Sequence, residues 1–61
     1  MANYHMYPTI EEAQQALETA LHDTEADHGK EAADEAWYDL VHVIALGCPS
    51  DVARELVRRN L

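Results

Sequence analysis

The chain is poor in cysteine, glycine and basic residues, and these shortages exclude several classes of protein. Its one cysteine, Cys48, excludes an intrachain disulfide and fits a reducing, intracellular setting. A domain of this size buries only about 60% of the surface that its unfolded chain exposes. We therefore expect dense helix packing or self-association to supply the stability that disulfides give to other small proteins.

Long hydrophobic runs are also missing. The longest apolar stretch, Leu40 to Leu46, is interrupted by His42 and is much shorter than the roughly 18 apolar residues of a membrane span. The first eight residues, MANYHMYP, show neither the basic nor the apolar region of a secretion signal. We expect a cytoplasmic protein with no membrane partner.

No pattern typical of an enzyme is present. The sequence has no glycine-rich loop that could hold a phosphate and no convincing acid/base pair. Cys48 lies near the start of a predicted helix, where the helix dipole would favour a thiolate. Gly47 and Pro49 on either side are equally typical of an ordinary turn, so a buried or incidental thiol is the favoured interpretation. We expect no catalytic residue, no catalytic activity and no cofactor.

Four histidines raise the question of a metal site. Glu18 with His22, or Asp39 with His42, could meet on one helical face. A two-metal bundle needs paired Glu-x-x-His elements, and this chain does not offer two of them. A zinc site would need four ligands from separate segments. Partly exposed histidines are the favoured interpretation, and no metal site is predicted.

The first helix has a clear start. Residues 9–12 have the pattern of a capping box. In this motif the Thr9 hydroxyl accepts a hydrogen bond from the Glu12 amide, and the Glu12 carboxylate accepts one from the Thr9 amide. A helix should begin at Ile10 and end near residue 28, because Gly29 can adopt the left-handed conformation that closes a helix. An alternative is that it frays after residue 22 into an acidic loop. Its apolar positions are Ile10, Ala13, Leu17, Ala20 and Leu21.

The stretch from Glu31 to Leu46 carries the only tryptophan and dominates the chain. Its apolar residues recur at steps of three and four, which places them on one face of a helix. They are Ala33, Ala36, Trp37, Leu40, Val41 and Ile44. The acids Glu31, Glu35 and Asp39 follow a different line along the same helix. The pattern predicts a central helix over 30–46, with one face in the core and another carrying a row of negative charge.

The last helix should follow the turn at Cys48 and Pro49. Ser50 or Asp51 suits the N-cap position, so we expect a helix over 51–60. Its apolar side consists of Val52, Leu56 and Val57.

The segment before the first helix has no helical period. We expect its large residues, Tyr4, Met6 and Tyr7, to cover one end of the core. Together these patterns predict an all-α single domain over 1–61, built as a compact three-helix bundle or an open helical array with a short irregular N-terminal arm.

Charge is the strongest compositional feature. Twelve acids against four basic residues give a net charge of −8, and the imbalance is concentrated in residues 1–39, where ten acids oppose Lys30 alone. Such a chain is repelled by nucleic acid and drawn to basic protein surfaces. The alternative is that the acids only keep the protein soluble.

Ordered carboxylates can compete for a groove that holds phosphates. Acids four apart on a helix stand about 6 Å apart along its axis, and DNA phosphates repeat about every 3.4 Å along a strand. The first helix could add a second row if it packs antiparallel to the central one. A half-exposed tyrosine among these acids would serve as an interface anchor. The predicted partner-binding residues are Glu11, Glu18, Glu25, Asp27, Glu31, Asp34, Glu35, Tyr38 and Asp39.

A very short, strongly acidic, helical chain without an enzymatic motif resembles in type the small phage-encoded anti-CRISPR inhibitors. That family has no common sequence signature, so no residue role is carried over. The resemblance implies a non-catalytic inhibitor acting by DNA mimicry inside an infected bacterial host. Its partner would be the basic groove of a nucleic-acid-binding protein or complex, without direct binding of nucleic acid by this chain.

Two other functions compete with this hypothesis. Residues 46–60 resemble a helix-turn-helix DNA-binding regulator in which Arg54, Arg58 and Arg59 contact DNA. The length of the preceding helix and the overall negative charge oppose it. The chain could also be a structural dimerisation module, in which a second copy covers leftover apolar surface. The sequence leaves open whether the chain is a monomer or a homodimer.

Overall fold

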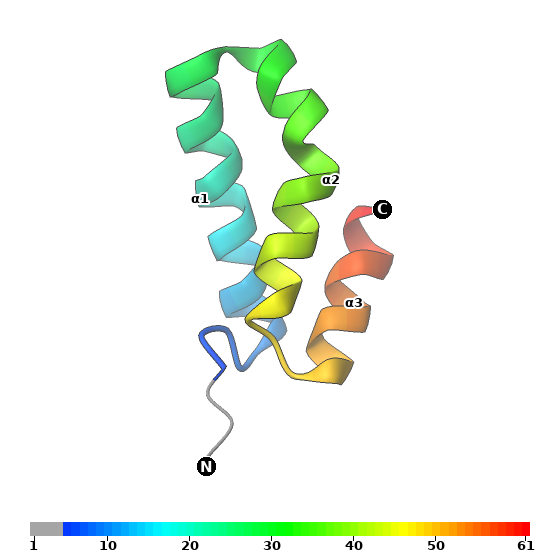
Figure 1. Cartoon of the computed structure of the whole chain (residues 1–61). Coiled ribbons are helices and arrows are strands. Elements are labelled where there is room, and N and C mark those ends of the chain that lie inside the picture. The colour runs from blue at the N-terminus through cyan, green and yellow to red at the C-terminus, as the bar shows by residue number, and fades with distance from the viewer. Residues whose placement is uncertain (1–4) are drawn as a thin grey trace.

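The computed structural model describes residues 5–61, which form three helices and no strand. α1 spans Ile10–His28, α2 spans Lys30–Leu46 and α3 spans Ser50–Asn60. The predicted all-α bundle is confirmed, and the predicted ranges of α1 and α2 coincide with those observed. Figure 1 shows α1 and α2 as a long antiparallel hairpin, with the shorter α3 beside the half of α2 that leads to Gly47.

Both ends of α1 form largely as predicted. The Thr9 hydroxyl accepts a hydrogen bond from the amide of Glu12 at 3.3 Å. The Glu12 carboxylate accepts from the Thr9 hydroxyl at 3.0 Å, not from the Thr9 amide as the capping-box pattern predicts. Gly29 ends α1 with a φ of +93°, a conformation that residues with a Cβ rarely adopt. Its carbonyl then accepts from the amide of Ala33, so a single residue joins the two helices.

The start of α3 differs from the prediction. The helix begins at Ser50, one residue early, and neither Ser50 nor Asp51 occupies the cap position. Pro49 takes that position with an extended backbone, and its carbonyl accepts from the amide of Ala53 at 2.8 Å. A proline can do this because the cap position uses its carbonyl and does not require an N–H.

The core lies where the three helices meet. Leu17 of α1, Val41 of α2 and Leu56 of α3 are fully buried. The same cluster includes Ala13, Ile44 and Cys48, and Ala33 is buried separately in the first half of α2. Every helix therefore contributes a large apolar side chain, which holds the hairpin and α3 together.

The N-terminal arm covers one end of this core through one residue of the predicted three. Tyr7 packs against the core, and its amide donates to the carbonyl of Gly47 at 3.0 Å. The Tyr7 ring would lie only 3.0 Å from a Cβ at position 47, so a glycine there permits the close contact. Met6 is 59% exposed, and Tyr4 lies outside the described residues.

α3 covers only part of the hairpin. Its last helical residue, Asn60, contacts Gln14 of α1 and Trp37 of α2. The hairpin continues beyond this level to the turn at Gly29, as Figure 1 shows. We call residues 23–35 the hairpin tip.

Candidate protein-binding surface

Acids are concentrated at the hairpin tip. Six of them lie within seven residues of Gly29: Asp23, Glu25, Asp27, Glu31, Asp34 and Glu35. All are exposed except Glu25, which is half-buried. Lys30 is the one lysine or arginine of this segment. The fold thus brings five of the nine predicted binding residues to one end of the molecule, together with Asp23.

The predicted row of acids lies along one exposed face of α2. Glu31, Glu35 and Asp39 are spaced four residues apart, about 6 Å along the axis per step. At about 100° per residue, Glu35 and Asp39 lie about 160° around the helix from Trp37, which faces α3. The row therefore lies on the side of α2 that α3 leaves uncovered.

Glu11 and Glu18 do not join this row. At about 100° per residue they lie within about 60° of Gln14 on α1, and Gln14 contacts α3. The Glu18 carboxylate also accepts a hydrogen bond from the Gln14 side chain at 3.2 Å. The predicted residues are thus divided between two sides of the hairpin, with Glu11 and Glu18 on the side of α3.

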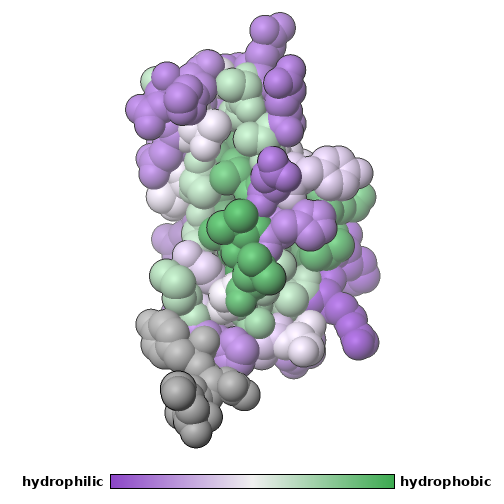
Figure 2. Space-filling view, viewed as in Figure 1, coloured by the Kyte–Doolittle hydropathy of each residue, from purple (hydrophilic) through white to green (hydrophobic). Residues whose placement is uncertain are grey.

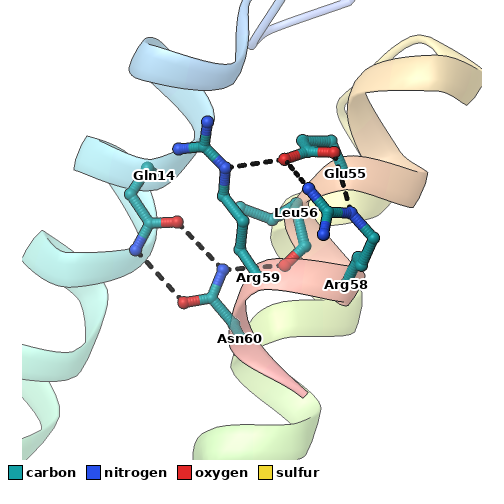
Figure 3. Close-up of polar contacts among 6 residues, drawn as sticks. All are labelled: Gln14, Glu55, Leu56, Arg58, Arg59 and Asn60. Atoms are coloured by element: carbon teal, nitrogen blue, oxygen red, sulfur yellow. Dashed lines mark hydrogen bonds and ion pairs between the residues drawn. The ribbon is translucent and has the colours of Figure 1, made fainter.

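Ion pairs in the described part of the chain are confined to α3. The Glu55 carboxylate pairs with Arg58 at 2.7 Å and with Arg59 at 2.9 Å (Figure 3). Hydrogen bonds from these two guanidinium groups lower the pKa of Glu55 below its usual value of 4.5. Among residues 5–61, none of the ten acids of α1 and α2 has a basic partner within ion-pair distance.

Tyr38 neighbours the last acid of the row, and an exposed apolar patch of Val43 and Leu46 lies further along α2. Its side chain is 64% exposed, and its ring stacks on that of His42 with centroids 6.4 Å apart. His42 Nδ1 donates to the Tyr38 carbonyl at 2.7 Å, which fixes the imidazole beside the ring. One turn further along, Val43 is 62% and Leu46 is 86% exposed. This patch was not predicted, and both of its residues fall outside the predicted apolar stripe of α2.

A groove of about 520 Å³ runs beside α1 on the other side from α3. Its walls come from the N-terminal arm, α1 and α2. The apolar lining residues are Met6, Tyr7, Ala16, Ala20 and Ile44, and Glu12, Gln15, Thr19 and Asp23 supply the polar lining. Figure 2 shows a band of hydrophobic residues along the middle of the visible face, with hydrophilic residues around the hairpin tip. The groove was not predicted, since it depends on how the arm and two helices meet.

A polar contact among all three helices was also missed. The side-chain amides of Gln14 and Asn60 exchange two hydrogen bonds, at 2.9 and 3.2 Å (Figure 3). Trp37 Nε1 donates to the main-chain carbonyl of Asn60 at 3.0 Å. A partly buried tryptophan needs such an acceptor, but the sequence does not indicate which residue provides it.

The residues considered for chemistry are dispersed or buried. Cys48 is buried, its thiol donates to the carbonyl of Ile44 at 3.3 Å, and burial raises its pKa. This agrees with a buried thiol and not with a thiolate stabilised by the helix dipole. Within residues 5–61, no three histidine, cysteine or acidic side chains lie close enough together to hold a metal ion.

No helix among the described residues combines the length and the apolar character needed to cross a membrane. The chain matches no protein-family model, and neither a curated protein nor a solved structure is similar to it.

Proposed function

We propose that this protein is a non-catalytic inhibitor that binds the basic, nucleic-acid-binding surface of another protein by presenting ordered carboxylates in place of phosphates. The observation that carries the proposal is the set of ten acids on α1 and α2, none of which has an ion-pair partner among residues 5–61. Solubility alone does not require such segregation, since a surface with both signs of charge interspersed also keeps a protein soluble.

The acids are held on a rigid frame. Leu17 and Val41 lock α1 and α2 together through the core, and Gly29 leaves no flexible loop between the helices. The row of Glu31, Glu35 and Asp39 thus keeps its spacing before the partner arrives. Preorganised charge binds more tightly than charge on a disordered chain, because less conformational entropy is lost.

The contact surface centres on the hairpin tip and the α2 row. Glu25, Asp27, Glu31, Asp34, Glu35 and Asp39 belong to it, with Tyr38 as an aromatic anchor at its edge. Glu11 and Glu18, on the side of α3, contribute only to the long-range field that attracts a basic partner.

The test begins with capture of the partner from the native host on the immobilised protein, followed by assays of whether that partner binds nucleic acid. The inhibitor should then compete with the nucleic acid, and its affinity should fall as salt is raised, because dense opposite charges are screened. A variant with Glu31, Glu35 and Asp39 changed to Lys should keep its helical circular dichroism signal and lose binding. Unchanged binding by that variant would overturn the proposal.

A charge-matched comparison separates a local contact from net charge. The variant Glu31→Gln/Glu35→Gln/Asp39→Asn removes three charges from the α2 row. The control Glu11→Gln/Glu18→Gln/Asp51→Asn removes three charges elsewhere. If the proposal is right, the first variant binds much more weakly than the control. Equal losses would mean that only total charge matters.

A further inference from the structure

We infer that the groove between α1, α2 and the N-terminal arm binds a basic amphipathic helix of the target protein. The inference rests on the proposed function, because it specifies which part of the inhibited protein binds to this chain. Two of the acids that have no ion-pair partner among residues 5–61, Glu12 and Asp23, line the groove beside its apolar residues, and this juxtaposition specifies both the shape and the charge of the occupant.

The groove occupies the side of α1 opposite α3. Gln14 contacts α3 through Asn60. Thr19 and Asp23, which line the groove, follow Gln14 by five and nine residues. At about 100° per residue they lie about 140° and 180° around the helix from it. The hairpin therefore has one face covered by α3 and an opposite face left open.

α3 shows what kind of element packs on this hairpin. It places Leu56 in the core, with Val52 and Val57 beside it, while Arg54 and Arg58 remain exposed. A helix with an apolar side and basic outer residues thus already fits one face of the hairpin. A second helix of the same kind on the open face would complete a four-helix arrangement.

The dimensions and lining of the groove suit a helix. From Glu12 to Asp23 it extends about 17 Å along α1, or about three helical turns. Ala16 and Ala20 are small and one turn apart, which lets a helix approach closely. Tyr7 supplies a larger apolar contact, and Ile44 lines the groove with the small part of its side chain that is exposed. Helices that bind in grooves use apolar residues at positions i, i+3, i+4 and i+7, a pattern about 10 Å long that fits within this length.

Charge decides between a target helix and a second copy of this chain. The carboxylates of Glu12 and Asp23 line the groove, and neither has an ion-pair partner among residues 5–61. A second copy would bring another net charge of −8 to this acidic side. Lysines or arginines flanking the apolar positions of a target helix would instead be attracted to it.

The probe is a synthetic, fluorescently labelled helical peptide with leucines along one face and lysines elsewhere. The control peptide has the same composition in an order that forms no apolar face, so that both carry the same charge. Fluorescence anisotropy at low and moderate salt measures binding of each peptide to the full chain. The amphipathic peptide should bind at least about tenfold more tightly than the control peptide, because only it can bury its leucines together.

Variants of the full chain locate the binding site. The double change Ala16→Gln/Ala20→Gln fills the groove without altering charge and should weaken amphipathic-peptide binding at least about tenfold. The matched control Ala26→Gln alters an exposed alanine of the same helix outside the groove and should leave binding unchanged. Because Ala16 packs against the core, amide chemical shifts of the unmodified chain provide a second measurement. The peptide should shift the signals of Ala16, Ala20 and Ile44 and not those of α3.

Several outcomes would overturn the inference. Equal binding of the two peptides would show that charge alone attracts them, which leaves the proposed function intact. Shifts confined to α3 would place the peptide elsewhere. A concentration-dependent dimer in sedimentation experiments, abolished by Ala16→Gln/Ala20→Gln, would show that a second copy fills the groove. The proposed function is tested separately, by measuring whether the α2 charge variants still compete with nucleic acid for the partner. Its failure can therefore be distinguished from failure of this inference.

Discussion

The side chains of Gln14 and Asn60, 46 residues apart in the sequence, form a reciprocal amide pair in which each group both donates and accepts a hydrogen bond. Asn60 Nδ2 also donates to the carbonyl of Leu56, and the Asn60 carbonyl accepts from Trp37 Nε1. One residue near the end of α3 thereby contacts both helices of the hairpin. This contact fixes the position of α3, which leaves the hairpin tip and the opposite face uncovered.

The amide pair should contribute measurably to stability. Asn60→Ala removes the pair but keeps the main-chain carbonyl that Trp37 uses. A net contribution of about 0.5–1.5 kcal/mol for each of the two hydrogen bonds predicts a loss of about 1–3 kcal/mol in the free energy of unfolding. Urea denaturation followed by Trp37 fluorescence measures it. Gln15→Ala, at an exposed neighbouring position, should change stability by less than about 0.5 kcal/mol.

A double-mutant cycle isolates the contact itself. Gln14→Ala and Asn60→Ala should together cost less than the sum of their separate costs, because both remove the same pair of hydrogen bonds. The expected coupling is about 1 kcal/mol. Strict additivity of the two changes would show that the amides do not stabilise one another.

Local signals in the sequence were sufficient for the helices. The apolar spacing around Leu17 and Val41 predicted which sides of α1 and α2 are buried, because a helix fixes side-chain direction every 3.6 residues. Thr9 and Gly29 predicted where α1 begins and ends. The observed start of α3 lies one residue before the predicted one, because Pro49 takes the cap position in place of a polar side chain.

The features that depend on packing could not be predicted in this way. The Gln14–Asn60 pair joins residues that no local pattern relates. The groove depends on Tyr7 of the arm meeting α1 and α2. The candidate site was anticipated in composition but not in arrangement, because sequence spacing cannot show that Glu18 lies on the side of α3 while Glu35 lies away from it.

Alanine substitutions should destabilise the protein strongly at buried leucines and hardly at exposed ones. Leu17→Ala and Leu56→Ala each remove a fully buried side chain and should cost about 2–5 kcal/mol. That cost is comparable with the whole stability of a domain of this size, so both variants should be largely unfolded at moderate temperature. Circular dichroism melting curves provide the measurement. Leu46→Ala is the matched control, because Leu46 is 86% exposed and its loss should barely change the melting temperature.

Salt should stabilise this protein. The acids of the hairpin tip repel one another in the folded state, and added ions screen that repulsion within about 10 Å at 0.1 M ionic strength. The melting temperature should therefore rise by several degrees between about 10 and 300 mM NaCl. In Glu31→Gln/Glu35→Gln/Asp39→Asn, which lowers the negative charge by three, the rise should be smaller. A melting temperature independent of salt would argue against repulsion at the tip.

The pairing of Glu55 with Arg58 and Arg59 should appear as a pH dependence of stability. Because the pKa of Glu55 is lowered in the folded protein from its usual value of 4.5, the folded state binds this proton more weakly than the unfolded state. The stabilisation is thus fully present above pH 4.5 and is lost as the pH falls through the lower folded value. Glu55→Gln should lower the melting temperature slightly at pH 7, the effect being small because the pair is exposed to solvent.

That difference between Glu55→Gln and the unmodified chain should shrink as the pH falls below about 4.5 and vanish once Glu55 is protonated in both states. Melting curves of both proteins between about pH 3 and 7 measure this difference in melting temperature. In an Arg58→Gln/Arg59→Gln background the same substitution should have no pH-dependent effect, because the groups that lower the pKa are gone. A difference that persisted in that background would assign the effect to the Glu55 side chain within α3 and not to its pairing with the two arginines.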